Sequence, residues 1–128
     1  MERKVVLAQG APAPIGPYSQ AVAAGDFIFC SGQIPLDPAT GALVEGDITV
    51  QAQRVLDNLE AVLAAAGSSL ARAVRITVYL RDLKDFGALN RVFEGRFKID
   101  PPARAVVQVS GLPKDASLEV DLIALKGK

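Results

Sequence analysis

The chain has 128 residues, of which half are hydrophobic and only 5% aromatic, and its 14 Lys and Arg balance 14 Asp and Glu. A neutral chain without a basic run is a poor candidate for nucleic-acid binding, and no apolar run is long enough to span a membrane. The absence of histidine excludes Ser-His-Asp and Cys-His catalysis and His-based metal sites, and one cysteine, Cys30, cannot form an internal disulfide.

This length fits one domain over residues 1–128. The start of the chain, "MERKVVLAQG", is too short and too polar for a signal peptide. Together with the single cysteine, it leads us to expect a cytoplasmic protein. The high apolar fraction favours coverage of some surface by other subunits.

The first third of the chain predicts three strands. Residues 5–8 have the pattern of a short strand, and "GAPAPIGPYSQ" after them is a loop because it contains three prolines and two glycines. Residues 18–24 and 27–33 are predicted to form a hairpin around Gly25 and Asp26. The segment "PLDPATGALVEGD" then predicts a long connector.

The segment "DITVQAQRVLDNLEAVLAAAG" predicts a helix because its apolar side chains recur on one stripe. The residues of this stripe are Val55, Leu56, Leu59, Val62, Leu63 and Ala66. Asp47 or Thr49 can cap the start of the helix, and Gly67 is predicted to end it.

Alternation in "RAVRITVYL" predicts a half-buried strand. The side chains expected to point inward are Val74, Ile76, Val78 and Leu80. A second helix is predicted from "DLKDFGALNRVFEGRF". The residues expected on its buried face are Phe86, Leu89, Phe93 and Phe97.

The last segment, "PPARAVVQVSGLPKDASLEVDLIAL", predicts two strands joined by a turn, with charges at Arg104 and Glu119. Side chains alternate along a strand, so a hairpin with its aliphatic sets against the helices would place both charges on the other face. Val106, Ile123 and Leu125 would share that face. The pattern fits either solvated charges in weak surface pairs or a cleft at a subunit interface.

The predicted order is therefore β-β-β-α-β-α-β-β. We expect an α+β fold in which one mixed β-sheet has two helices packed on one face.

Five segments carry a family resemblance. In order they are "IGPYSQAV", "FCSGQIPLDPATG", "QAQRVLDNLEAVLAAAG", "VYLRDLKDFGALNRVF" and "PPARAVVQVSGLPKDASLEVDLIAL". They resemble the successive motifs of the RidA family of reactive-intermediate imine deaminases, from about Leu7 to Leu125. The resemblance implies a RidA-like domain with a chorismate-mutase-like fold. It also implies a homotrimer whose sheets line a central barrel, with active sites in the clefts between subunits.

The resemblance implies hydrolysis of reactive 2-imino and 2-enamino acids, such as 2-iminobutanoate and 2-iminopropanoate, to 2-keto acids and ammonia. It implies no metal and no cofactor. The chemistry of two residues fits this reaction, because a planar guanidinium binds a carboxylate bidentately and a carboxylate can activate water. Arg104 and Glu119 are thus the expected catalytic residues.

By resemblance, Tyr18 closes the pocket from the neighbouring subunit, Ser31 and Gly32 contact the substrate, and Asn90 supports the rim. Taken singly, each of these residues also fits a packing or solvated role. Val106 is expected to line the same pocket. Many deaminase-competent members of the family have Cys at this position, and the change bears on substrate fit and oxidative regulation more than on hydrolysis.

Two other functions stay open at this point. One is a non-catalytic, ligand-binding or regulatory trimer that uses Arg104 to hold a keto acid. The other is a ribonuclease or translation initiation inhibitor, the older descriptions of the family. Zero net charge and the lack of histidine argue against an RNA-directed function. The expected partners are 2-imino or 2-keto acids and other copies of the chain, without a membrane.

Overall fold

The computed structural model describes residues 1–127, which fold into a six-stranded sheet and two α-helices. The elements are β1 (Arg3–Val6), β2 (Ala21–Ala24), β3 (Phe27–Gln33), α1 (Ile48–Ala65), β4 (Ala73–Leu80), α2 (Phe86–Arg96), β5 (Ala103–Gln108) and β6 (Leu118–Leu125). Short 3-10 turns occupy Leu70–Arg72, Leu83–Asp85 and Pro113–Asp115. The predicted order of strands and helices is confirmed.

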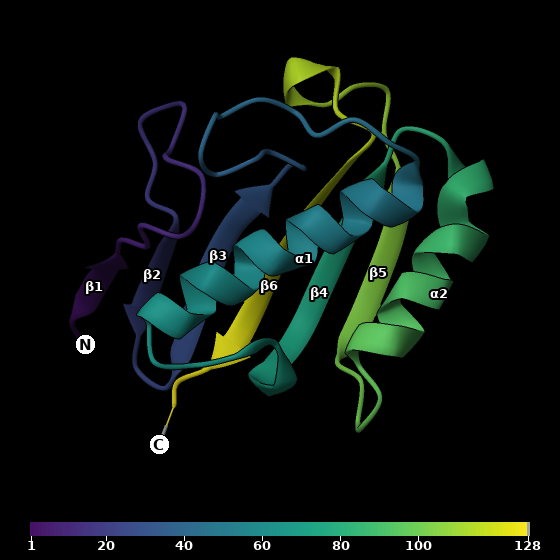
Figure 1. Cartoon of the computed structure of the whole chain (residues 1–128). Coiled ribbons are helices and arrows are strands. Elements are labelled where there is room, and N and C mark those ends of the chain that lie inside the picture. The colour runs from purple at the N-terminus through teal and green to yellow at the C-terminus, as the bar shows by residue number, and fades with distance from the viewer. Residues whose placement is uncertain (128) are drawn as a thin grey trace.

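The strands lie side by side in the order β1-β2-β3-β6-β4-β5. All neighbours are antiparallel except β4 and β5, which are parallel. Both helices cover the same face of the sheet, and the core lies between them and the sheet (Figure 1). The predicted α+β class is therefore confirmed.

Helix α1 begins and ends where the sequence predicts. The side chain of Asp47 accepts a hydrogen bond of 3.1 Å from the backbone N–H of Val50, so Asp47 is the N-cap. Gly67 follows the helix with a φ of 76°, a left-handed conformation that favours glycine. The N–H of Ser68 then donates to the carbonyl of Leu63 at 2.8 Å, which closes the last turn.

Strands β5 and β6 do not form the predicted hairpin. Strand β5 pairs in parallel with β4, with Arg104 in register with the buried Ile76, and β6 lies between β3 and β4. The reason is α2, because a helix between two strands returns the chain to run parallel to the first strand. Arg104 and Val106 therefore face the helices. Glu119, in register with Tyr79, faces away from them.

Val74 is exposed, contrary to the prediction that it points into the core. Ala73 is in register with Ala124, and Arg75 with Ile123, so β4 has one extra residue at this step. Such a β-bulge turns the extra side chain out of the alternating pattern. Ala73 takes the core position instead.

Three smaller details also differ from the sequence pattern. Strand β1 occupies Arg3–Val6 rather than residues 5–8, and β2 begins at Ala21 rather than at residue 18. Phe86 is 40% exposed because it lies at the start of α2, beside Arg104.

Within residues 1–127, neither helix combines the length and apolarity needed to cross a bilayer.

Candidate functional site

Arg104 lies near the start of the edge strand β5, and two aromatic rings of α2 flank it. Its guanidinium carbon is 5.6 Å from the centroid of the Phe86 ring and 5.3 Å from that of Phe93. Both distances fall within the range of about 6 Å for cation–π attraction. The ion pairs found within residues 1–127 do not include Arg104. Its N–H groups are thus available to a ligand.

A groove opens beside Arg104, between α2 and the residues before β5. It is lined by Asn90, Phe93, Glu94, Phe97, Pro101, Pro102 and Arg104. Asn90 is half-buried and reaches the groove from α2. Val106 follows Arg104 on the same face and packs against the core. We call Phe86, Asn90, Phe93, Arg104 and Val106 the arginine half-site.

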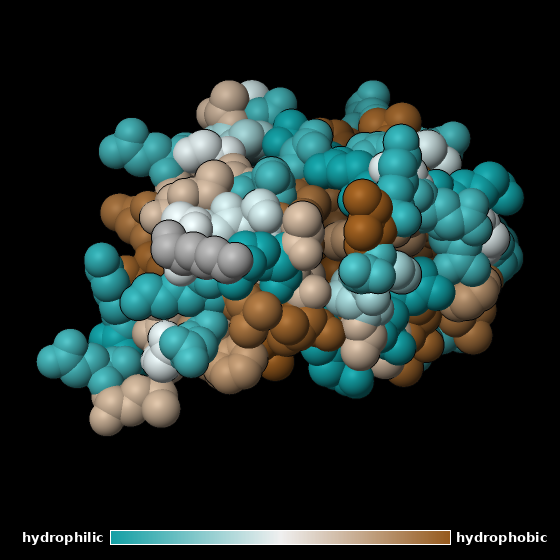
Figure 2. Space-filling model, turned by 90° about the horizontal axis from the view of Figure 1, so that it is seen from below, coloured by the Kyte–Doolittle hydropathy of each residue, from teal (hydrophilic) through white to brown (hydrophobic). Residues whose placement is uncertain are grey.

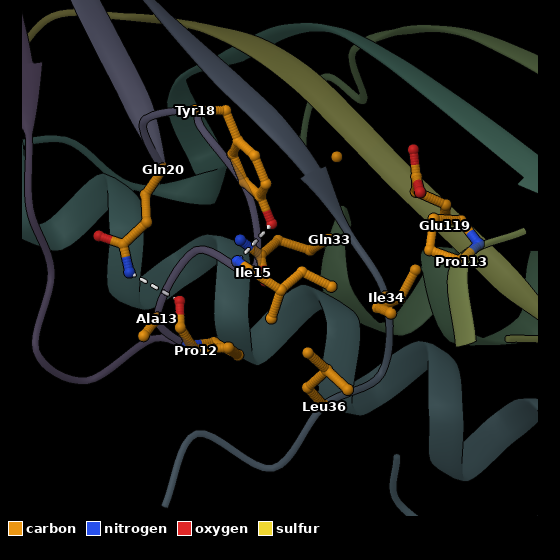
Figure 3. Close-up of a pocket in the computed structure, with 11 residues that line it drawn as sticks. Pro12, Ala13, Ile15, Tyr18, Gln20, Gln33, Ile34, Leu36, Pro113 and Glu119 are labelled. Carbon is orange, nitrogen blue, oxygen red and sulfur yellow. Dashed lines mark hydrogen bonds between the residues drawn. The ribbon is translucent and has the colours of Figure 1, made fainter. Parts of the chain in front are cut away.

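Glu119 lies in a separate pocket on the other side of the sheet. This pocket is lined by Ile15, Tyr18, Ser31, Gly32, Pro113 and Glu119. Figure 3 shows an overlapping pocket that extends to the proline-rich loop, with Tyr18 and Glu119 on opposite sides and Ile15 between them. The Tyr18 hydroxyl accepts a hydrogen bond of 3.3 Å from the N–H of Ile15. We call Tyr18, Ser31, Gly32 and Glu119 the glutamate half-site.

A bulge in β3 brings its backbone against the Glu119 side chain. Between Cys30 and Gln33, β3 has one more residue than the paired segment of β6. A Cβ atom on Gly32 would lie 2.8 Å from Cδ of Glu119, closer than real side chains approach. Ser31 and Gly32 thus lie in a bulge, and Gly32 leaves room for the carboxylate.

A buried glutamine holds the proline-rich loop that precedes β2. The Gln20 side chain accepts a hydrogen bond of 2.6 Å from the N–H of Ala8 and donates to the carbonyl of Ala8 at 3.1 Å. It also donates to the carbonyl of Pro12 at 2.9 Å (Figure 3). The Ser31 hydroxyl donates to the carbonyl of Ser19 at 2.6 Å. These bonds fix the loop beside β3, and the loop carries the tyrosine of the glutamate half-site.

The electrostatic environment makes Glu119 an unusual carboxylate. Burial and, to a smaller extent, the nearby charge of Asp121 raise the pKa of Glu119 above its ordinary value. Asp121 lies on the same face and accepts a hydrogen bond of 3.0 Å from the Tyr79 hydroxyl, which raises the pKa of Tyr79. A carboxyl group whose pKa moves toward neutral pH suits proton transfer better than an ordinary one.

The remaining candidates for chemistry are the thiol of Cys30 and clusters of side chains that could bind a metal ion. Cys30 is buried in β3, and burial with the charge of Asp121 raises the pKa of its thiol to about 12. The thiolate is therefore scarce at neutral pH. In the part of the chain that the structure describes, no group of three or more His, Cys, Asp or Glu side chains could hold a metal ion.

The two half-sites of one chain cannot act on one small ligand. Strands β5 and β6 are separated by β4, roughly 10 Å across the sheet, and the two side chains point to opposite faces. The expectation that Arg104 and Glu119 share the helix-free face is therefore wrong within one chain. A ligand that touches both residues requires one from a second copy.

The helix-free face also exposes apolar side chains. Phe27, Phe29 and Val107 are each 42–45% exposed, and Ile123 and Leu125 lie partly buried on the same face, as expected. The lower end of the molecule, which is a different surface from the helix-free face, also shows brown hydrophobic patches between teal hydrophilic side chains (Figure 2). Exposed apolar surface that lies together on one face is typical of protein–protein contacts.

Sequence reasoning did not identify the two rings beside Arg104 or the Tyr79–Asp121 pair. It assigned Phe86 and Phe93 to the core from their helical spacing. The available signal was the strand–helix–strand pattern from β4 to β5, because a parallel crossover packs the helix against the strand that follows it. The face of Asp121, relative to Glu119, follows from strand alternation alone.

Comparisons with known proteins place the chain among close relatives. The family model described as Endoribonuclease L-PSP matches residues 8–126. A RutC family protein of Pyrococcus abyssi is 51% identical over 126 residues, which cover 98% of this chain and 99% of that protein. The crystal structure of RidA from an Antarctic Psychrobacter has a TM-score of 0.92 at 43% identity, covering 95% of this chain and 98% of that one. E. coli TdcF, solved with bound serine, has a TM-score of 0.90 at 41% identity, covering 97% and 99%.

Proposed function

Because the chain belongs to the RidA family, whose model is described as Endoribonuclease L-PSP, we propose that it hydrolyses 2-imino and 2-enamino acids to 2-keto acids and ammonia. The observation that carries the proposal is the pairing of two chemistries on one chain. Arg104 offers a guanidinium that makes no ion pair with residues 1–127, and Glu119 offers a carboxylate with a raised pKa. The first binds the substrate carboxylate, and the second moves protons.

The proposed active site forms between two copies of the chain. The arginine half-site comes from one copy and the glutamate half-site from its neighbour, because the two lie on opposite faces of one sheet. The proposed assembly is the homotrimer with a central barrel that the family resemblance implies. Two features support this assembly: the apolar helix-free face, and the outer edge of β5, which pairs with no other strand within residues 1–127. Both are surfaces that another subunit can cover.

The proposed reaction starts from the protonated imine, held through its carboxylate by two parallel hydrogen bonds from Arg104. Glu119 takes a proton from a water molecule as the water oxygen bonds to the imine carbon, which gives a carbinolamine. The protonated Glu119 then donates to the amine nitrogen, and the carbon–nitrogen bond breaks as the carbonyl forms. The hydroxyl proton passes through Glu119 to the departing ammonia. The net change is iminium plus water to keto acid plus ammonium, and Glu119 is regenerated.

A second candidate is carboxylate binding without turnover. It is favoured by E. coli TdcF, which was solved with a bound amino acid, serine. Serine shares the carboxylate of the proposed substrates, so an arginine half-site could hold either. Both candidates predict that Arg104→Ala loses affinity for the ligand. Only the hydrolase predicts that the wild-type protein accelerates the release of ammonia from the imine.

The test is a coupled assay in which a threonine dehydratase generates 2-iminobutanoate, and the release of 2-oxobutanoate is compared with and without this protein. We expect acceleration by the wild type and its loss in Glu119→Gln. The matched control is Glu45→Gln, because Glu45 is an exposed carboxylate outside both half-sites. A wild-type protein that binds 2-oxobutanoate but leaves the release rate unchanged would favour the ligand-binding candidate.

A further inference from the structure

The clearest feature beyond the proposed chemistry is the pair of rings around Arg104. Phe86 and Phe93 lie about two turns apart on the same side of α2. Both ring centroids are within 6 Å of the guanidinium carbon of Arg104, at 5.6 and 5.3 Å. We propose that these two rings form an aromatic bracket that positions the Arg104 guanidinium for a carboxylate ligand. Phe86 and Phe93 are then positioning residues that set substrate affinity. The identity of the substrate rests on the proposed function.

Core packing explains Phe93 but not Phe86. Phe93 is 7% exposed and belongs to the main core, whereas Phe86 is 40% exposed. Burial in this chain therefore accounts for only part of the placement of the Phe86 ring, which leaves room for a second explanation. The contact that it makes with the guanidinium of Arg104 provides one.

The physical effect of the bracket is to order the arginine before the ligand arrives. A free arginine side chain has many rotamers, and ordering them on binding weakens affinity. A guanidinium is planar and weakly hydrated, so it stacks on the faces of aromatic rings better than the compact ammonium of lysine does. The attraction to the rings uses none of the N–H groups, so they stay free for the carboxylate.

This role predicts an effect on binding and not on the chemical step. The substrate carboxylate does not change during imine hydrolysis, so the bracket stabilises ground state and transition state alike. Loss of such uniform binding raises KM and leaves kcat unchanged. A merely structural role for Phe86 would instead lower the thermal stability or disturb both constants.

The experiment measures binding of 2-oxobutanoate to the assembled protein by calorimetry, with KM and kcat from the coupled assay. Phe86→Leu keeps apolar bulk but removes the ring, and we expect about two- to five-fold weaker binding, equivalent to roughly 0.5–1 kcal/mol. Phe86→Tyr keeps the ring and should bind like the wild type. Leu83→Ala is the control, because Leu83 is also exposed on the segment leading into α2 but lies outside the half-site.

Three outcomes in the variant series would overturn the bracket. They are unchanged affinity in Phe86→Leu, an equal loss in Phe86→Tyr, and a fall in kcat at constant KM. A wild-type protein that binds no 2-oxobutanoate would also overturn it. If the binding series follows expectation while the wild type fails to accelerate imine hydrolysis, the proposed hydrolase function fails and the bracket stands.

Discussion

Arg104→Ala and Glu119→Gln should each be inactive alone and active when their subunits are mixed. Removing one partner of a buried charge pair costs roughly 2–5 kcal/mol. The proposed neighbouring subunit covers the site of Arg104, so Arg104→Ala should lose roughly 30- to 4000-fold in kcat/KM. Glu119→Gln should bind substrate but lose the proton-transfer contribution, roughly 100- to 10,000-fold. Each variant keeps one intact half-site.

The size of the recovery follows from the position of the two residues on opposite faces of the sheet. In a closed ring of randomly mixed subunits, each proposed site takes its arginine half-site from one copy and its glutamate half-site from the next. With equal amounts of the variants, each half is native with a chance of about one-half. About a quarter of all sites should therefore be native, and about a quarter of wild-type activity should return.

The assay dissociates and reassociates the two variants together, verifies hybrid oligomers by native mass spectrometry, and measures 2-oxobutanoate release. Variants combined without dissociation are the control and should stay inactive. Hybrids that form but show no recovered activity would refute the division of the site between copies. A monomer at micromolar concentration in light scattering would refute the oligomer itself.

Four further results are expected. Gly32→Ala should lower kcat by roughly ten-fold because the new Cβ displaces the Glu119 carboxylate, a small misplacement with a large kinetic effect; an unchanged kcat would contradict this contact. Activity requires ionised Glu119 and is lost as the pH falls through its raised pKa, so Asp121→Asn, which removes one cause of the rise, should shift the acid limb of the pH–kcat profile to lower pH; a fixed limb would count against it. Asp47→Ala should lower the free energy of unfolding by about 1 kcal/mol in urea denaturation through loss of the N-cap, and equal midpoints would show that the cap is dispensable. Dialysis against a chelator should leave imine hydrolysis unchanged, and activity that returns only with a divalent ion would overturn the metal-free scheme.

Local pattern predicted the elements well because it depends on residues close in sequence. The cap at Asp47, the stop at Gly67 and the alternation of β6 are each visible within a few residues. Strand pairing was predicted wrongly because it depends on which strands meet after folding. The hairpin expectation paired β5 with its neighbour in sequence, whereas α2 places it parallel to β4. The β-bulge at Val74 was not predicted either, because one extra residue in a strand does not change the composition of the segment.

The candidate site shows the same division. Family motifs singled out Arg104, Glu119 and their companions, and their roles stay predictions. The motifs carry no information about which face of the sheet each residue occupies. One wrong strand partner moved Arg104 to the wrong face and hid its contact with Phe86. The sequence pattern placed Arg104 and Glu119 on one face of the sheet, whereas the structure places them on opposite faces.

The hydrogen bonds of Gln20 make the wall of the glutamate pocket sensitive to a single functional group. Its amide both accepts from Ala8 and donates to the carbonyls of Ala8 and Pro12. Deamidation to glutamate keeps the size and shape of the side chain but removes both donated hydrogen bonds. Each buried carbonyl left unpaired costs about 1–3 kcal/mol. Chemical ageing at this one residue would therefore weaken the attachment of the proline-rich loop.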